Sequence, residues 1–124
     1  TMSNENSFFS CFNNCETKTG GIFMFYNVLK TKELVHLDNE PFKRETLMEH
    51  NTSSLNIVAI KKNEIIDTHT SIEDAAVYVL DGEIELHFDA EKFTLDKGEM
   101  IMFKKDTEHK VFAKKDSKFL VVKI

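Results

Sequence analysis

Tryptophan is absent from this sequence of 124 residues, proline occurs once and cysteine occurs twice. Cys11 and Cys15 have neither a second cysteine pair nor a nearby histidine to complete a zinc site, so we interpret them as two reduced thiols. No apolar run approaches the roughly 18 residues of a membrane-spanning helix, and the first residues lack the pattern of a secretory signal. We therefore expect a soluble cytoplasmic protein with no membrane partner.

Basic residues are too few and too dispersed for a nucleic-acid surface. The chain has 16 Lys and Arg against 21 Asp and Glu, which gives a net charge of -5, and it has no basic block. Nucleic-acid affinity depends on clustered Lys and Arg, so we expect no nucleic-acid partner. The eleven phenylalanines, together with many Lys, Asn and Ile, are typical of AT-rich bacterial genomes.

The start of the chain differs from the rest. Residues 1–23 are polar and turn-rich, with scattered aromatics and neither a helical nor a strand period, so we interpret them as an N-terminal extension. Residues 24–124 then form a single domain, because the chain is too short for two cores. One hypothesis is that translation starts at Met24; another is that the aromatic residues of the extension dock on a neighbouring subunit.

From about residue 34 the chain consists of ten short apolar runs separated by turn signals. The runs are rich in Val, Ile, Phe and Tyr, which favour strands, and a short helical turn fits only residues 31–35. In residues 83–88 apolar side chains alternate with charged or polar ones, as in a strand with one buried face. Asp81 and Gly82 predict a tight hairpin turn. We therefore expect an all-β antiparallel sandwich or barrel.

Two motifs in this region resemble those of the cupin superfamily. The first cupin motif has the form G-x5-H-x-H-x3-4-E-x6-G, and here His69 matches its first histidine and Gly82 its last glycine. The second has the form G-x5-P-x-G-x2-H-x3-N; it begins at Gly98, and His109 matches its histidine. The resemblance covers roughly residues 30 to 124. It implies a jelly-roll β-barrel, an antiparallel sandwich of two sheets.

Several positions depart from these motifs. Asn63 stands at the first glycine, where asparagine also tolerates a left-handed backbone. Ser71 stands at the second histidine, and alanine stands at the glutamate position at either allowed spacing, Ala75 or Ala76. In the second motif other residues replace the proline, the glycine and the asparagine: Lys104, Asp106 and Ala113. Two of the four metal ligands of the family are therefore missing.

The resemblance implies a metal site of three histidines and a carboxylate, a set of donors that suits Zn, Fe, Mn or Ni. In this sequence His69 and His109 are the candidate metal ligands, and Asp74 or Glu73 is the candidate carboxylate. An offset of one residue in a strand turns a side chain to the other face, so Asp74 serves only if the chain forms a loop there. Without a carboxylate, two neutral histidines bind a divalent ion weakly. The sequence leaves the binding of a divalent transition metal open.

For function, the leading hypothesis is that a small organic ligand binds in the barrel, where the metal centre has degenerated. His69, Ser71 and His109 then act as hydrogen-bond partners, while Val77 and Met102 contribute to the walls of the ligand cavity. The alternative is a metal-dependent cupin enzyme of the isomerase, dioxygenase or decarboxylase type, in which an ion on His69 and His109 polarises a carbonyl or enolate. We also expect a homodimer, because an antiparallel sandwich of this size leaves sheet edges that pairing would cover.

Overall fold

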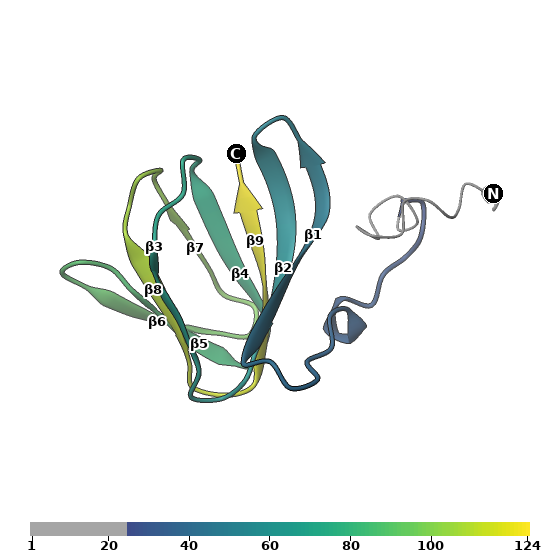
Figure 1. The fold of residues 1–124 in the computed structure, drawn as a ribbon, viewed down its shortest axis with the longest axis horizontal. Helices are drawn as coiled ribbons and strands as arrows, with labels where there is room; N and C mark the ends of the chain where they lie inside the picture. The colour runs from purple at the N-terminus through teal and green to yellow at the C-terminus, as the bar shows by residue number, and fades with distance from the viewer. Residues whose placement is uncertain (1–24) are drawn as a thin grey trace.

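The computed structural model describes residues 25–124, in which the regular secondary structure is almost entirely β (Figure 1). Within this range a short 3₁₀ helix, η3 (Thr31–Glu33), precedes nine strands. The strands are β1 (Phe42–His50), β2 (Ser53–Ile60), β3 (Ile65–His69), β4 (Ala75–Asp81), β5 (Glu83–His87), β6 (Lys92–Asp96), β7 (Met100–Phe103), β8 (His109–Ala113) and β9 (Ser117–Lys123). Cys11, Cys15, Met24 and the extension predicted for residues 1–23 lie outside the described residues. No helix in residues 25–124 is long and apolar enough to cross a membrane.

The strands form two sheets that face each other (Figure 1). One sheet has five strands in the order β1-β2-β9-β4-β7, and the other has four strands in the order β3-β8-β5-β6. All neighbouring strands are antiparallel. The chain passes from one sheet to the other after β2, β3, β4, β6, β7 and β8, which is the winding of a jelly roll. The predicted all-β jelly-roll fold is confirmed.

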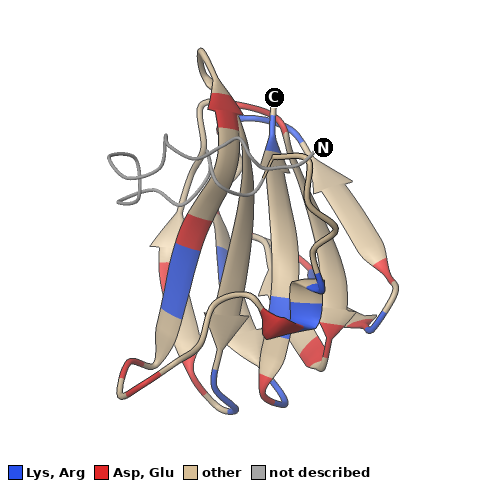
Figure 2. Ribbon diagram, turned by 90° about the vertical axis from the view of Figure 1, so that its right-hand side faces the viewer, with Lys and Arg blue, Asp and Glu red and all other residues tan. Residues whose placement is uncertain are grey.

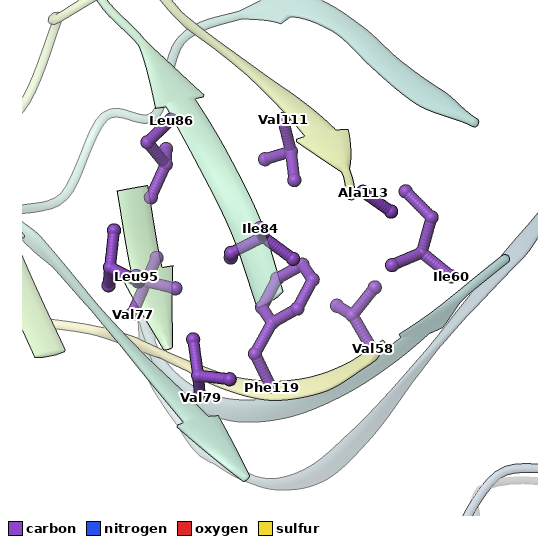
Figure 3. Close-up of a cluster of buried hydrophobic side chains, with 10 residues drawn as sticks. All are labelled: Val58, Ile60, Val77, Val79, Ile84, Leu86, Leu95, Val111, Ala113 and Phe119. Atoms are coloured by element: carbon purple, nitrogen blue, oxygen red, sulfur yellow. The ribbon is translucent and has the colours of Figure 1, made fainter. Parts of the chain in front are cut away.

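The core lies between the two sheets, where alternate residues of facing strands meet (Figure 3). In β5 the alternation predicted from the sequence is confirmed, because Ile84 and Leu86 are completely buried. Full burial of a side chain of this size stabilises the fold by about 1.5–3 kcal/mol. The buried cluster consists of Val58, Ile60, Val77, Val79, Ile84, Leu86, Leu95, Val111, Ala113 and Phe119.

A second, smaller cluster covers part of the outer face of the five-stranded sheet. Val35 packs there on β2, and Nζ of Lys118 donates hydrogen bonds to the backbone carbonyls of Lys32 and Leu34. Residues 33–37, the first of the apolar runs, do not form a strand. Val35 has a φ of 58°, which an extended strand does not permit. The helical turn predicted nearby is η3.

The corner between β4 and β5 corrects one prediction. A hairpin at Asp81 and Gly82 is wrong, because β4 and β5 lie in different sheets and do not pair. The turn instead carries the chain across the sandwich, and Gly82 adopts a φ of +90°. A Cβ atom here would lie 2.7 Å from Cα of Ser117 and closer still to Oγ of Ser117 and the carbonyl oxygen of Asp116. Glycine is therefore required both for its backbone conformation and for space.

Candidate functional site

A cavity of about 450 Å³ lies between the two sheets. It adjoins the core, because its apolar walls include five members of the core cluster: Val58, Val77, Leu86, Val111 and Phe119. The polar residues of its lining are Arg44, Asp67, Thr68, His69, Ser71, His109 and Lys123. A mostly apolar cavity with a few polar groups is the usual form of a small-molecule site.

The structure brings the two predicted histidines together. His69 in β3 pairs with His109 in β8, and their ring centroids lie 4.1 Å apart in an edge-to-face arrangement. The His109 ring also packs on the ring of Phe103, with a centroid distance of 4.6 Å. His109 is buried, at 8% exposed, whereas His69 is exposed. The pair therefore extends from the solvent into the cavity.

An irregularity in β3 gives His69 its inward direction. Ile66 pairs with Val111 and His69 pairs with His109, so three steps along β3 oppose two steps along β8. The extra residue forms a β-bulge, which shifts the alternation of the strand by one. In a regular strand the odd spacing would place Ile66 and His69 on opposite faces. With the bulge, both residues line the cavity.

Hydrogen bonds determine which nitrogen of each imidazole carries the proton. Nδ1 of His69 donates to the carbonyl oxygen of Asp67 at 2.7 Å, and Nδ1 of His109 donates to that of Thr107 at 2.9 Å. A carbonyl oxygen only accepts, so Nδ1 carries the proton in each neutral ring. Nε2 therefore keeps its lone pair and is available to accept a hydrogen bond or to bind a metal ion.

The surroundings of His109 favour its neutral form. Burial lowers the pKa of His109 because the charged ring loses hydration, and repulsion from Lys123, and from His69 when that ring is protonated, lowers it further. The hydrogen bond to Thr107 opposes this change, since it stabilises the protonated ring. Because the pKa lies below its ordinary value of 6.5, the ring is neutral at pH 7.

Ser71 and the two candidate metal-binding carboxylates, Glu73 and Asp74, are engaged in local hydrogen bonds. Ser71 is buried in the cavity wall, and its Oγ donates to Oε1 of Glu73 at 2.9 Å and accepts the backbone N–H of Glu73 at 3.1 Å. Oδ1 of Asp74 accepts the backbone N–H of Lys105 at 2.9 Å. Neither Glu73 nor Asp74 lines the cavity. Within residues 25–124 no three side chains of His, Cys, Asp or Glu are placed to hold a metal ion, so the donor set of the family's metal centre is incomplete in this range.

Of the two predicted wall residues, the structure places Val77 in the cavity and Met102 outside it. Val77 is 3% exposed, whereas Met102 is 71% exposed. Pairing between β4 and β7 explains the difference, because Val77 pairs with Ile101 and Ala76 pairs with Met102. Ile101 and Phe103 therefore share the inward face and Met102 points outward. The structure corrects the expectation for Met102, and Phe103 lines the cavity instead.

Of the seventeen residues of the lining, sequence analysis identifies four as cavity residues, and among the thirteen that it misses are Phe42, Arg44 and Lys123. A signal for Lys123 is present, because it follows Phe119 and Val121 at intervals of two residues and strand alternation places all three on one face. Arg44 gives no comparable signal. Its direction follows from its pairing with Val58 of β2.

Comparisons with known proteins agree with this architecture. Residues 56–123 match the sequence model of the cupin domain family. A conserved protein of unknown function from Streptococcus pyogenes, SPY1581, is 24% identical with a TM-score of 0.70, over 79% of this chain and 87% of that chain. An RmlC-like cupin protein from Desulfovibrio desulfuricans is 25% identical with a TM-score of 0.69, over 77% and 93% of the two chains.

A cupin 2 conserved barrel domain protein from Leptotrichia buccalis is 28% identical with a TM-score of 0.69. That match covers 75% of this chain and 45% of that chain. Comparison with curated proteins gives no match. Since the family match spans more than half of the sequence, the chain belongs to the cupin family.

Proposed function

We propose that this cupin binds a small organic ligand in the cavity between its sheets, with His69, Ser71 and His109 as hydrogen-bond partners. The observation that carries the proposal is the pair of imidazoles, with ring centroids 4.1 Å apart, whose Nδ1 atoms bond to backbone carbonyls and which line a mostly apolar cavity. The volume of about 450 Å³ is in the range of pockets that hold small molecules, roughly 300–1,000 Å³.

Each polar group has a definite hydrogen-bonding capacity toward a ligand. Nε2 of His69 and Nε2 of His109 accept, so they suit the hydrogens of a hydroxyl or an amide. Oγ of Ser71 already donates to Glu73, so it is also left as an acceptor. A hydrogen bond of this kind contributes about 0.5–1.5 kcal/mol. The apolar walls add affinity by removing the carbon skeleton of the ligand from water.

A thermal-shift screen of small organic compounds tests the proposal. A ligand at 100 times its Kd stabilises the folded state by about 2.7 kcal/mol, which corresponds to a rise in Tm of roughly 10 °C for a chain of this size. Compounds that stabilise the native protein should fail to stabilise the His69→Ala/His109→Ala variant.

The matched control is the His36→Ala/His50→Ala variant, which removes two imidazoles that do not line the cavity. This variant should respond to the compounds as the native protein does. Equal stabilisation of both double variants would show that binding does not involve the cavity histidines.

A metal-dependent enzyme is the second candidate. It is favoured by the Nδ1 bonds of His69 and His109 to backbone carbonyls, because metal-binding histidines commonly donate their other ring N–H in this way. The donor set opposes it, since among the described residues no carboxylate completes the pair of histidines. Elemental analysis of protein purified without chelator separates the two candidates. Near-stoichiometric metal that is lost in His69→Ala/His109→Ala supports the enzyme, and no metal after incubation with Fe(II), Mn(II), Ni(II) and Zn(II) excludes it.

A further inference from the structure

Two cations lie in the wall of the cavity that faces the histidines. Arg44 is on β1 and Lys123 is on β9, and both strands belong to the five-stranded sheet. His69 and His109 are on β3 and β8 of the facing four-stranded sheet. Figure 2 shows positively charged segments on β1 and at the end of β9 beside the C-terminus. A ligand between the sheets therefore has cations on one side and the two imidazoles on the other.

Neither cation is paired with an acidic side chain of the described chain. No ion pair within residues 25–124 includes Arg44 or Lys123. On the outside of the sandwich, by contrast, Nζ of Lys114 lies 3.5 Å from Oε2 of Glu83. The apolar walls beside Lys123, which is half-buried, screen its charge less than bulk water does, so that Lys123 attracts an anion more strongly than a fully exposed lysine would.

The cavity also differs in charge from the protein as a whole. The chain has a net charge of -5, yet the lining holds Arg44 and Lys123 against a single acidic residue, Asp67. Lys123 acts across the cavity, since its positive charge contributes to the lowered pKa of His109. Arg44 is exposed and Lys123 is half-buried, so a ligand reaches both from the solvent.

Building on the proposed function, we propose that the ligand is a small organic anion whose carboxylate or phosphate group binds Arg44 and Lys123. The guanidinium of Arg44 offers a planar set of N–H donors that matches two oxygens of such a group, and the ammonium of Lys123 adds a compact charge. The apolar part of the ligand fills the cavity. A hydroxyl on that part donates to Nε2 of His69 or His109.

Titration of the ¹⁵N-labelled full chain, followed by NMR, tests this assignment. The probes are three acids with matched neutral compounds: benzoate and benzamide, 4-hydroxybenzoate and 4-hydroxybenzamide, and phenyl phosphate and phenol. At least one acid should bind at the cavity with an affinity about tenfold or more above that of its neutral partner, because charge-assisted hydrogen bonds are roughly twice as strong as neutral ones. The carboxylate and phosphate probes also show which anionic group is preferred.

Variants show whether the two cations cause the preference. In Arg44→Gln/Lys123→Gln the preference for the acid should fall below about twofold, while the affinity for the neutral compound is unchanged. The matched control, Lys43→Gln/Lys110→Gln, removes two charges at positions next to Arg44 and His109 that do not line the cavity. It should keep the full preference for the acid.

The outcomes separate this inference from the proposed function. If a neutral compound binds at the cavity as tightly as its acid, the anion assignment is overturned and ligand binding stands. If Arg44→Gln/Lys123→Gln keeps the preference, the assignment to these two residues is overturned. If none of the six probes binds at the cavity, the anion assignment is overturned, and the thermal-shift screen decides separately whether the cavity binds another small molecule.

Discussion

Replacing Gly82 by alanine should destabilise the fold much more than the same replacement at Gly98. Both glycines have a positive φ, +90° and +88°, so alanine meets similar backbone strain at each position. That strain costs about 1–3 kcal/mol. At Gly98 the added methyl group meets nothing within 4 Å, whereas at Gly82 it overlaps Ser117 and the carbonyl oxygen of Asp116. The difference in stability between the Gly82→Ala and Gly98→Ala variants therefore measures the cost of steric overlap apart from that of backbone strain.

The additional cost at Gly82 comes from displacing the start of β9. Overpacking in a folded protein costs about 1–3 kcal/mol. Oγ of Ser117 also accepts the N–H of Glu83 at 2.9 Å and donates to the carbonyl oxygen of Lys115 at 2.7 Å, so its displacement weakens both bonds. We expect a loss of about 3–6 kcal/mol for Gly82→Ala and about 1–3 kcal/mol for Gly98→Ala.

Urea unfolding followed by far-ultraviolet circular dichroism measures this difference, because the chain has no tryptophan for fluorescence. With a denaturant slope of about 1–3 kcal/mol per M, the midpoint of Gly82→Ala should lie roughly 1–2 M below that of Gly98→Ala. Coincident midpoints would refute the close approach of the β4–β5 corner to β9.

Three further predictions concern stability. The protein should lose stability as the pH falls below about 6.5, since the lowered pKa of His109 means that the unfolded chain takes up the proton first. The stability that the neutral His109 ring contributes is fully present above its ordinary pKa of 6.5 and is lost as the pH falls through the lower pKa of the folded protein. If the free energy of unfolding of a His109→Gln variant depended on pH as that of the native protein does, the prediction would be contradicted. Asn56→Ala should lower the free energy of unfolding in urea by about 2–4 kcal/mol, because the buried side-chain amide accepts a hydrogen bond from Thr46 and donates one to the carbonyl oxygen of Val121. A loss below about 1 kcal/mol is inconsistent with these hydrogen bonds. Lys118→Met should speed hydrogen exchange in residues 31–37 but not in the core, and unchanged exchange would mean that apolar contacts alone hold this segment.

Features that depend on local chemistry were predictable from the sequence. In β5, Ile84 and Leu86 alternate with glutamates, and both are completely buried. Asn63 adopts the left-handed φ, 71°, that was expected where the family has a glycine. Strand alternation and left-handed turns are set by a few neighbouring residues, so one sequence is sufficient to locate them.

Features that depend on pairing between distant strands were not predictable. Asp81-Gly82 has the chemistry of a hairpin turn, but β4 and β5 pair with other strands. Met102 lies in a four-residue strand that is apolar throughout, so no alternation indicates its direction. Arg44 points inward because of its pairing with Val58. The bulge that turns His69 into the cavity is likewise defined by the register with β8.

The homodimer, the cytoplasmic location and the bacterial origin inferred from the sequence stay predictions. Sedimentation velocity measures the oligomeric state directly. A mass near that of one chain, 14.3 kDa, would contradict the dimer.

Native mass spectrometry of the full chain, expressed in its native cells and purified without chelator, tests most directly whether the cavity holds a small organic ligand. We expect the mass of a small organic molecule on the native protein and on the His36→Ala/His50→Ala variant, and its absence from His69→Ala/His109→Ala. A metal ion as the only bound species, or the same bound mass on all three proteins, would contradict ligand binding by the cavity histidines.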